Sequence, residues 1–203
     1  RIKQSYNSYL KTLELDPNNA NALKGIAWIV FSYERNTEEA NRIVDAILIN
    51  HRAPDFYLFK SQIAQYEGNA VKEEAYRDAY FALLREHNYG NMYNKNNVLV
   101  YADHKSTAQK ALETAKIEIE YRPTPDSYDL LAWCYYKLGE KKIALEIAQN
   151  FVVGKTFEPK AQYHLAMIYK SNNYIAKIKP IKEGLCKSRF ELGPNYDKKL
   201  KQL

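Results

Sequence analysis

The residue types that most often carry catalysis or bind metals are few and widely separated in this chain of 203 residues. Neighbouring residues on a helix point in different directions, so Asp103 and His104 do not form a metal-ligand pair. Neither cysteine has a histidine near it in the sequence, and Cys134 lies in an apolar run, which predicts an unreactive buried thiol. The four histidines fall in different parts of the chain: His51, His87, His104 and His164. We therefore expect no metal site.

Carboxylates and glycines also lack a catalytic arrangement. The adjacent pairs Glu38-Glu39 and Glu73-Glu74 are placed in the first turns of expected helices, where negative charge favours the helix dipole. Gly90 and Gly184 stand alone, so no glycine-rich loop could hold a phosphate. The sequence predicts a protein that is not an enzyme, with no catalytic residues and no cofactor.

Large aromatic side chains are the remaining candidates for chemistry, and their chemistry is binding. The chain contains 18 tyrosines but only two tryptophans, Trp28 and Trp133. Each tryptophan directly follows an alanine, in KGIAWIVFSY and LLAWCYYKLG. Rigid aromatic rings make good anchors for a bound partner. The recurrence of one local frame about a hundred residues apart indicates an internal repeat.

A repeat of 34 residues accounts for that recurrence. TPDSYDLLAWCYYKLGE aligns without a gap on APDFYLFKSQIAQYEGN, so that Ala132 falls on Ser61. The same frame gives a 34-residue step from Ala27 to Ser61 and from Ala132 to Ala166. Val98 is the expected anchor of the unit between them, 37 residues after Ser61. Five units result, the third being the most degenerate.

Each unit is predicted to form two helices. Pro54, Pro125 and Pro159 suit the first turn of the first helix, and Gly68 and Gly139 suit its left-handed end. Thr124 is expected to cap a helix, and Ser106 to Gln109 resembles a capping box. Alanines four residues apart place a small-residue stripe on the second helix, as in Ala111/Ala115 and Ala144/Ala148. The alanine stripe is less regular in the second unit, where about two extra residues precede Ala75. In the fifth unit, Pro180 predicts that the second helix starts late.

This pattern resembles the tetratricopeptide repeat (TPR) over nearly the whole chain, and in particular bacterial proteins that are described only by their repeats. The resemblance implies an all-α fold, a right-handed α–α superhelix of about five helix pairs forming one solenoid domain over 1–203. The expected parts are the second helix of a truncated repeat at 1–17, repeat units at 18–52, 53–90, 91–123, 124–158 and 159–188, and a capping tail at 189–203. Because the sequence starts inside a helical pattern, we expect further residues before Arg1.

In this family, the fifth, ninth and twelfth residues of each repeat tend to line a concave groove. Carried over, the resemblance implies that Leu58, Leu99, Ala102 and Met167 face inward together with the candidate partner-binding residues. These candidates are Lys24, Trp28, Phe31, Gln62, Gln65, Lys95, Asp129, Trp133, Tyr136, Tyr163 and Lys170. The alternative for both tryptophans is that they pack between adjacent first helices as core, and partial burial would serve both roles.

The resulting functional hypothesis is a protein-binding scaffold that holds a peptide or protein segment in its groove. Two alternatives stay open: a structural part of a larger exported or envelope-attached protein, and a carbohydrate or small-ligand binder that uses the groove aromatics. The net charge of +6 comes largely from C-terminal lysines, which we interpret as a solvated helix face, so we expect no nucleic-acid partner. No run is long enough to insert in a membrane. The heavy use of Lys, Asn, Ile and Tyr favours a bacterial source with an AT-rich genome. The compartment stays open between the bacterial cytoplasm and the periplasm or export, and the solenoid ends offer surfaces for oligomerisation.

Overall fold

The computed structural model describes residues 1–203, and all of its regular structure is helical, which confirms the all-α prediction. The short helices that are not α-helical are the π-helix Val30–Glu34 and the 3-10 helices Lys105–Thr107 and Ile175–Lys177. The α-helices are α1 (Ile2–Leu15), α2 (Ala20–Ile29), α3 (Thr37–Asn50), α4 (Pro54–Glu67), α5 (Ala70–Glu86), α6 (Asn94–Ala102), α7 (Ala108–Tyr121), α8 (Pro125–Lys137), α9 (Lys141–Phe151), α10 (Pro159–Ser171), α11 (Ile178–Lys187), α12 (Arg189–Leu192) and α13 (Tyr196–Lys201).

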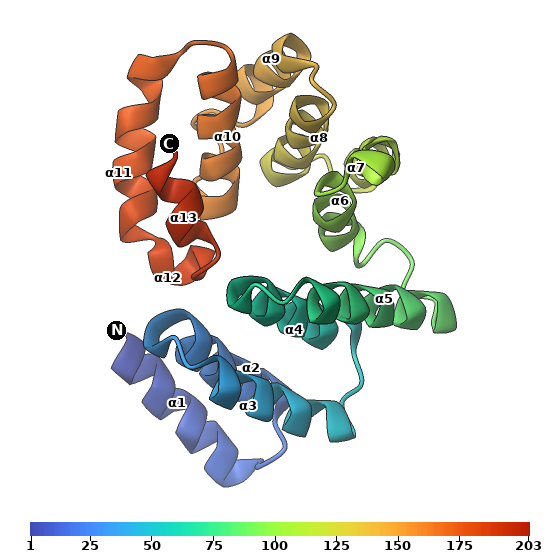
Figure 1. The fold of residues 1–203 in the computed structure, drawn as a ribbon, viewed down its shortest axis with the longest axis vertical. Helices are drawn as coiled ribbons and strands as arrows, with labels where there is room; N and C mark the ends of the chain where they lie inside the picture. The colour runs from blue at the N-terminus through green and yellow to red at the C-terminus, as the bar shows by residue number, and fades with distance from the viewer. The chain divides into compact units, whose positions relative to one another are not determined.

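The chain divides into two compact units, and helices pack mainly against their neighbours in sequence (Figure 1). Unit 1 comprises residues 1–88 together with 193–197, and unit 2 comprises residues 89–192 together with 198–203. In unit 1 the pairs are α2 with α3 and α4 with α5, and α1 packs on α2. In unit 2 they are α6 with α7, α8 with α9 and α10 with α11. The first helix of the middle pair, α8, also contacts the first helices α6 and α10 on its two sides.

Local sequence signals set most of the helix ends. The helices α4, α8 and α10 begin at the predicted prolines, and the Thr124 hydroxyl accepts a hydrogen bond from the Ser127 amide. Gly68 ends α4 with a left-handed φ of 73°. In the fifth pair a 3-10 turn precedes α11, and Pro180 lies in the first turn of α11, as predicted.

The capping box predicted at Ser106 to Gln109 is wrong. The residue before α7 is Thr107, and its side chain makes no capping hydrogen bond to the helix. The Thr107 hydroxyl instead donates to the Tyr101 carbonyl at 2.7 Å, which ties the 3-10 turn to the end of α6. A hydroxyl with a carbonyl within reach has an alternative to capping.

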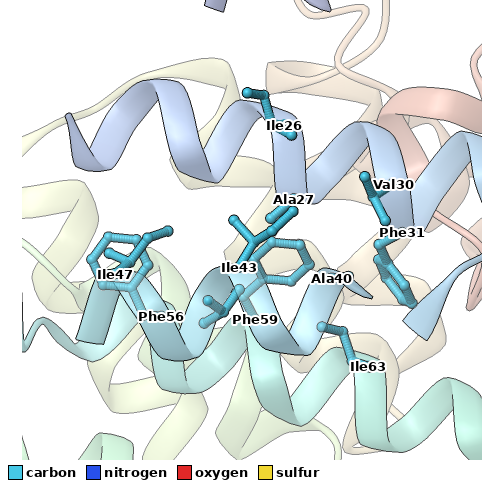
Figure 2. Close-up of a cluster of buried hydrophobic side chains, with 11 residues drawn as sticks. Ile26, Ala27, Val30, Phe31, Ala40, Ile43, Ile47, Phe56, Phe59 and Ile63 are labelled. Carbon is cyan, nitrogen blue, oxygen red and sulfur yellow. The ribbon is translucent and has the colours of Figure 1, made fainter. Parts of the chain in front are cut away.

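The core of unit 1 is a cluster in which α2, α3 and α4 converge (Figure 2). Phe56, Phe59 and Ile63 of α4 fill the space beside α3, while the fully buried Ala27 and Ala40 bring α2 and α3 close together. Small residues at the contact allow the two backbones to approach, and large apolar residues from the next helix close the gap.

Unit 2 uses alanine in the same way. Ala132 and Ala166 of the first helices are fully buried, as are Ala144 and Ala148 of α9, in a cluster with Leu165 and Ile168. The other predicted anchors, Ser61 and Val98, are buried too. The helix α5 differs, because Ala75 is exposed and Tyr80 and Leu83 are buried instead. Its partner α4 therefore meets large side chains rather than an alanine stripe.

Candidate functional site

Every predicted partner-binding residue lies on the first helix of a pair or in the π-helix that directly continues α2. Five are in unit 1, and we call their surroundings the Trp28 face: Lys24, Trp28, Phe31, Gln62 and Gln65. Six are in unit 2, and we call their surroundings the Trp133 face: Lys95, Asp129, Trp133, Tyr136, Tyr163 and Lys170.

Aromatic rings form the base of the Trp28 face. The half-buried Trp28 ring lies 6.0 Å from the ring of Phe31 and 5.7 Å from that of Phe59, between centroids. Phe31 itself is buried, so it supports Trp28 from below and offers no surface to a partner. Trp28 thus combines both roles considered for it, since one part of its ring packs against the core and another part stays accessible.

A π-helix shapes one edge of this face. It covers Val30–Glu34 and ends at Arg35, which has a left-handed φ of 61°. Single π turns inside helices occur often at functional positions. The Arg35 Nη2 atom lies 3.0 Å from a carboxylate oxygen of Asp197. The Nη1 atom of Arg35 is buried and has no hydrogen-bond partner.

A segment from the C-terminal part of the chain, Gly193–Asp197, lies on the Trp28 face. A Cβ atom placed on Gly193 would be 2.8 Å from Cη2 of Trp28, so the glycine backbone rests directly against the indole. The side-chain amide of Asn195 donates to the backbone carbonyl of Gln62 at 2.8 Å. The sequence predicted a capping tail here and gave no sign of a contact with Trp28 or Gln62.

The Trp133 face is a stack of rings. Trp133 stacks on Tyr136 with centroids 4.9 Å apart and on His164 with centroids 4.1 Å apart. Only 8 % of Trp133 is exposed, so most of its surface is used inside the protein. Burial raises the pKa of Tyr136, and burial together with nearby Tyr136 and Asp103 raises that of Tyr163 to about 12. Both phenols therefore stay protonated and neutral over the physiological range.

Beneath these rings lies a buried pair that sequence reasoning missed. His164 Nδ1 of α10 is 2.8 Å from a carboxylate oxygen of Asp129 of α8, and both side chains are almost fully buried. A histidine paired with a carboxylate supplies two of the three members of a catalytic triad, but no hydroxyl or thiol is hydrogen-bonded to this histidine. Cys134 is buried, and burial raises its pKa to about 12, which keeps its thiol protonated. The arrangement therefore suits a structural role, in which a buried polar contact links the two first helices α8 and α10.

A repeated lysine–aspartate contact joins other first helices. Lys24 of α2 lies 2.5 Å from Asp55 of α4, and Lys95 of α6 lies 3.9 Å from Asp126 of α8. In the 34-residue frame, both lysines occupy the fifth place of a repeat. Both aspartates occupy the second place of the following repeat. The lysines at the fifth place, which were predicted to bind a partner, thus form ion pairs with the next repeat. The signal was present in the sequence as a Lys/Asp pair 31 residues apart, which occurs twice at these frame positions.

The two remaining candidates also have partners in the protein. The side-chain amide of Gln65 donates to the Glu73 carboxylate at 3.0 Å. The exposed Lys170 donates to the backbone carbonyl of Gln202, so a residue of the predicted groove again holds the main chain of the C-terminal tail. In each unit, predicted positions thus contact the C-terminal tail of the chain.

No group of three or more histidine, cysteine, aspartate or glutamate side chains lies close enough to hold a metal ion. No helix has the length and hydrophobicity needed to cross a bilayer. In comparisons with known proteins, no family model matches this chain and no curated protein shows a significant similarity to it.

Proposed function

We propose that this chain is a TPR-like solenoid that acts as a non-catalytic scaffold and binds a peptide or protein segment along its first helices. In this proposal α2, α4, α6, α8 and α10 are the inner helices of five repeats that wind into a right-handed superhelix. The buried small anchors at 34-residue steps and the recurring Lys–Asp contact support it. Stacked repeats bury a continuous core, which leaves the inner helices free to present side chains.

The observation that carries the binding function is the segment Gly193–Asp197 on the Trp28 face. Two residues proposed from their repeat position, Trp28 and Gln62, already contact a stretch of chain that lies outside the five repeats. The contacts are of the kind that hold peptides in general: backbone against an aromatic ring and an amide hydrogen bond. A surface with this chemistry suits an extended or turn-forming segment of a partner protein.

The alternative of a carbohydrate site built on the tryptophans has weaker support. Sugar binding by stacking needs an open aromatic face, whereas Trp133 stacks on Tyr136 and His164 and is 8 % exposed. Peptide binding does not need an open aromatic face, because a peptide can contact the exposed edge of a ring and hydrogen-bond to backbone carbonyls. A role as a structural part of a larger protein is compatible with the proposal if the bound segment belongs to the same polypeptide.

Selection from a random 12-residue phage-display library tests the proposal. We expect peptides whose affinity, measured by fluorescence anisotropy, falls at least about tenfold when the half-buried Tyr136 on the Trp133 face is replaced by alanine. The matched control is Tyr121→Ala at the exposed end of the second helix α7, which should leave affinity unchanged. A library that yields no binder, or binders equally sensitive to both changes, would contradict the proposal.

A further inference from the structure

We propose that Gly193–Asp197 is an internal ligand of the Trp28 face, and that an external peptide of the same chemistry displaces it to bind there. The required chemistry is a glycine followed, four residues later, by a carboxylate. This inference rests on the proposed peptide-binding function and names both the class of partner and the way in which its access is controlled.

The first contact selects glycine. Gly193 has a left-handed φ of 82°, and a Cβ at this position would lie 2.8 Å from Cη2 and 3.3 Å from Cζ2 of Trp28. Real Cβ atoms do not approach a ring this closely, and an L-residue at such a φ is strained as well. Any segment that replaces Gly193 on the indole must therefore present a glycine there.

The other contacts select polar groups. The side-chain amide of Asn195 donates to the backbone carbonyl of Gln62, and Asp197 pairs with Arg35 at 3.0 Å. The three residues that make these contacts come from a stretch of five, with Gly193 and Pro194 buried and Asn195 and Asp197 half-buried. The stretch is thus bound through its backbone and side chains and is not merely lying on the surface.

Arg35 shows that the internal ligand is an incomplete one. Asp197 reaches Nη2, while the buried Nη1 has no hydrogen-bond partner. A buried donor without a partner is unfavourable. A carboxylate that reached both nitrogens would form the bidentate pair that arginine makes best, so an external acidic segment has an interaction to gain that Asp197 does not provide.

The covalent connection explains why an incomplete ligand still occupies the face. Its flanks are anchored by buried Leu192 and Leu200 in unit 2. A segment held within the same chain has an effective concentration on the order of millimolar. Weak contacts are then enough to keep Gly193–Asp197 on the Trp28 face. An external partner must either bind this face tightly or meet a protein in which the segment has already been released.

The test compares the full-length protein with the release variant Asn195→Ala/Asp197→Ala, which removes both polar contacts without touching the core. The control variant, Asp78→Ala/Asn150→Ala, changes the same residue types at exposed positions. The probe is a fluorescein-labelled peptide with the sequence of residues 191–198, ELGPNYDK, and the control peptide is ELGPAYAK. Binding is followed by anisotropy, and acrylamide quenching of Trp28 is measured in a Trp133→Phe background.

We expect the release variant to bind ELGPNYDK at least about tenfold more tightly than the wild type or the control variant, since the competing segment is gone. Trp28 should become more accessible to acrylamide in the release variant alone. Adding Arg35→Ala to the release variant should abolish binding, and ELGPAYAK should not bind. Unchanged quenching of Trp28 would overturn the internal-ligand assignment, and equal peptide binding by all variants would overturn the competition.

The two proposals fail in different ways. If library-selected peptides bind and ELGPNYDK binds the wild type and the release variant equally, this inference is wrong while the proposed peptide-binding function stands. If the library yields no binder to either protein and ELGPNYDK also fails to bind the release variant, both proposals are wrong.

Discussion

The buried Asp129–His164 pair should be energetically coupled, and a double-mutant cycle measures that coupling. The Nδ1–Oδ2 distance is 2.8 Å, and Asp129 and His164 are 5 % and 2 % exposed. Hydrogen bonds that involve a charged group contribute about 1.5–3 kcal/mol, and a buried partner left alone adds its own desolvation cost. We expect Asp129→Ala to lower the free energy of unfolding by about 3 kcal/mol.

His164→Phe keeps a ring beside Trp133 but leaves the Asp129 carboxylate buried and unpaired, so it should cost about 3–5 kcal/mol. In the double variant neither polar group is left without a partner. Its cost should therefore be smaller than the sum of the single costs by at least about 1.5 kcal/mol.

The assay is urea unfolding followed by far-UV circular dichroism and by tryptophan fluorescence. In a Trp28→Phe background the emission comes from Trp133, whose ring is stacked on His164 at 4.1 Å and so reports on unit 2 directly. The matched control is the exposed pair Lys95–Asp126, separated by 3.9 Å, for which the coupling should be about 0.2–1 kcal/mol. Costs of Asp129→Ala and His164→Phe that add within about 0.5 kcal/mol would refute the reasoning.

Three further predictions concern packing and thiol chemistry. Ala132→Leu should lower the free energy of unfolding by about 1–3 kcal/mol in urea titrations, because the residue is fully buried between helices; an unchanged midpoint would contradict the close packing of α8. Gly25→Ala should lower the melting temperature measured by circular dichroism, because the new Cβ would overlap the ring of Tyr9, and Tyr9→Ala should relieve the effect. At pH 8 iodoacetamide should label the exposed Cys186 and spare Cys134 in mass spectrometry of the folded protein, since a pKa of about 12 leaves roughly one thiolate in ten thousand. Equal labelling of both thiols in the folded protein would contradict the burial of Cys134.

Helix boundaries and small-residue positions were predictable because their causes are local. A proline in a first turn, a threonine cap and a left-handed glycine act within one turn of the chain, so Pro54, Thr124 and Gly68 mark the helix ends that the structure has. The 34-residue recurrence of Ala27, Ser61, Ala132 and Ala166 likewise predicted buried positions. The same local logic was wrong at Thr107, where a nearby carbonyl competed for the hydroxyl.

The contacts that define the candidate site could not be obtained in this way. Asp129 meets His164 across 35 residues, and Asn195 meets Gln62 across 133 residues. Neither pair shares a helix turn, and nothing in the local composition of 189–203 sets it apart from an ordinary capping tail. Side chains separated so far along the chain meet only when helix packing brings their backbones to within a few ångströms.

By itself, the sequence determined that this protein is helical, where most helices begin and end, and which small residues lie between them, because these properties depend on backbone preferences and on a repeated apolar pattern. Only the tertiary structure decided that Trp133 is mostly covered and that Phe31 is buried beneath Trp28, where no partner could reach it. It also decided that Gly193–Asp197 occupies the Trp28 face. The physical reason is that exposure and pairing are properties of the packed molecule, set by distances between elements that no local preference encodes.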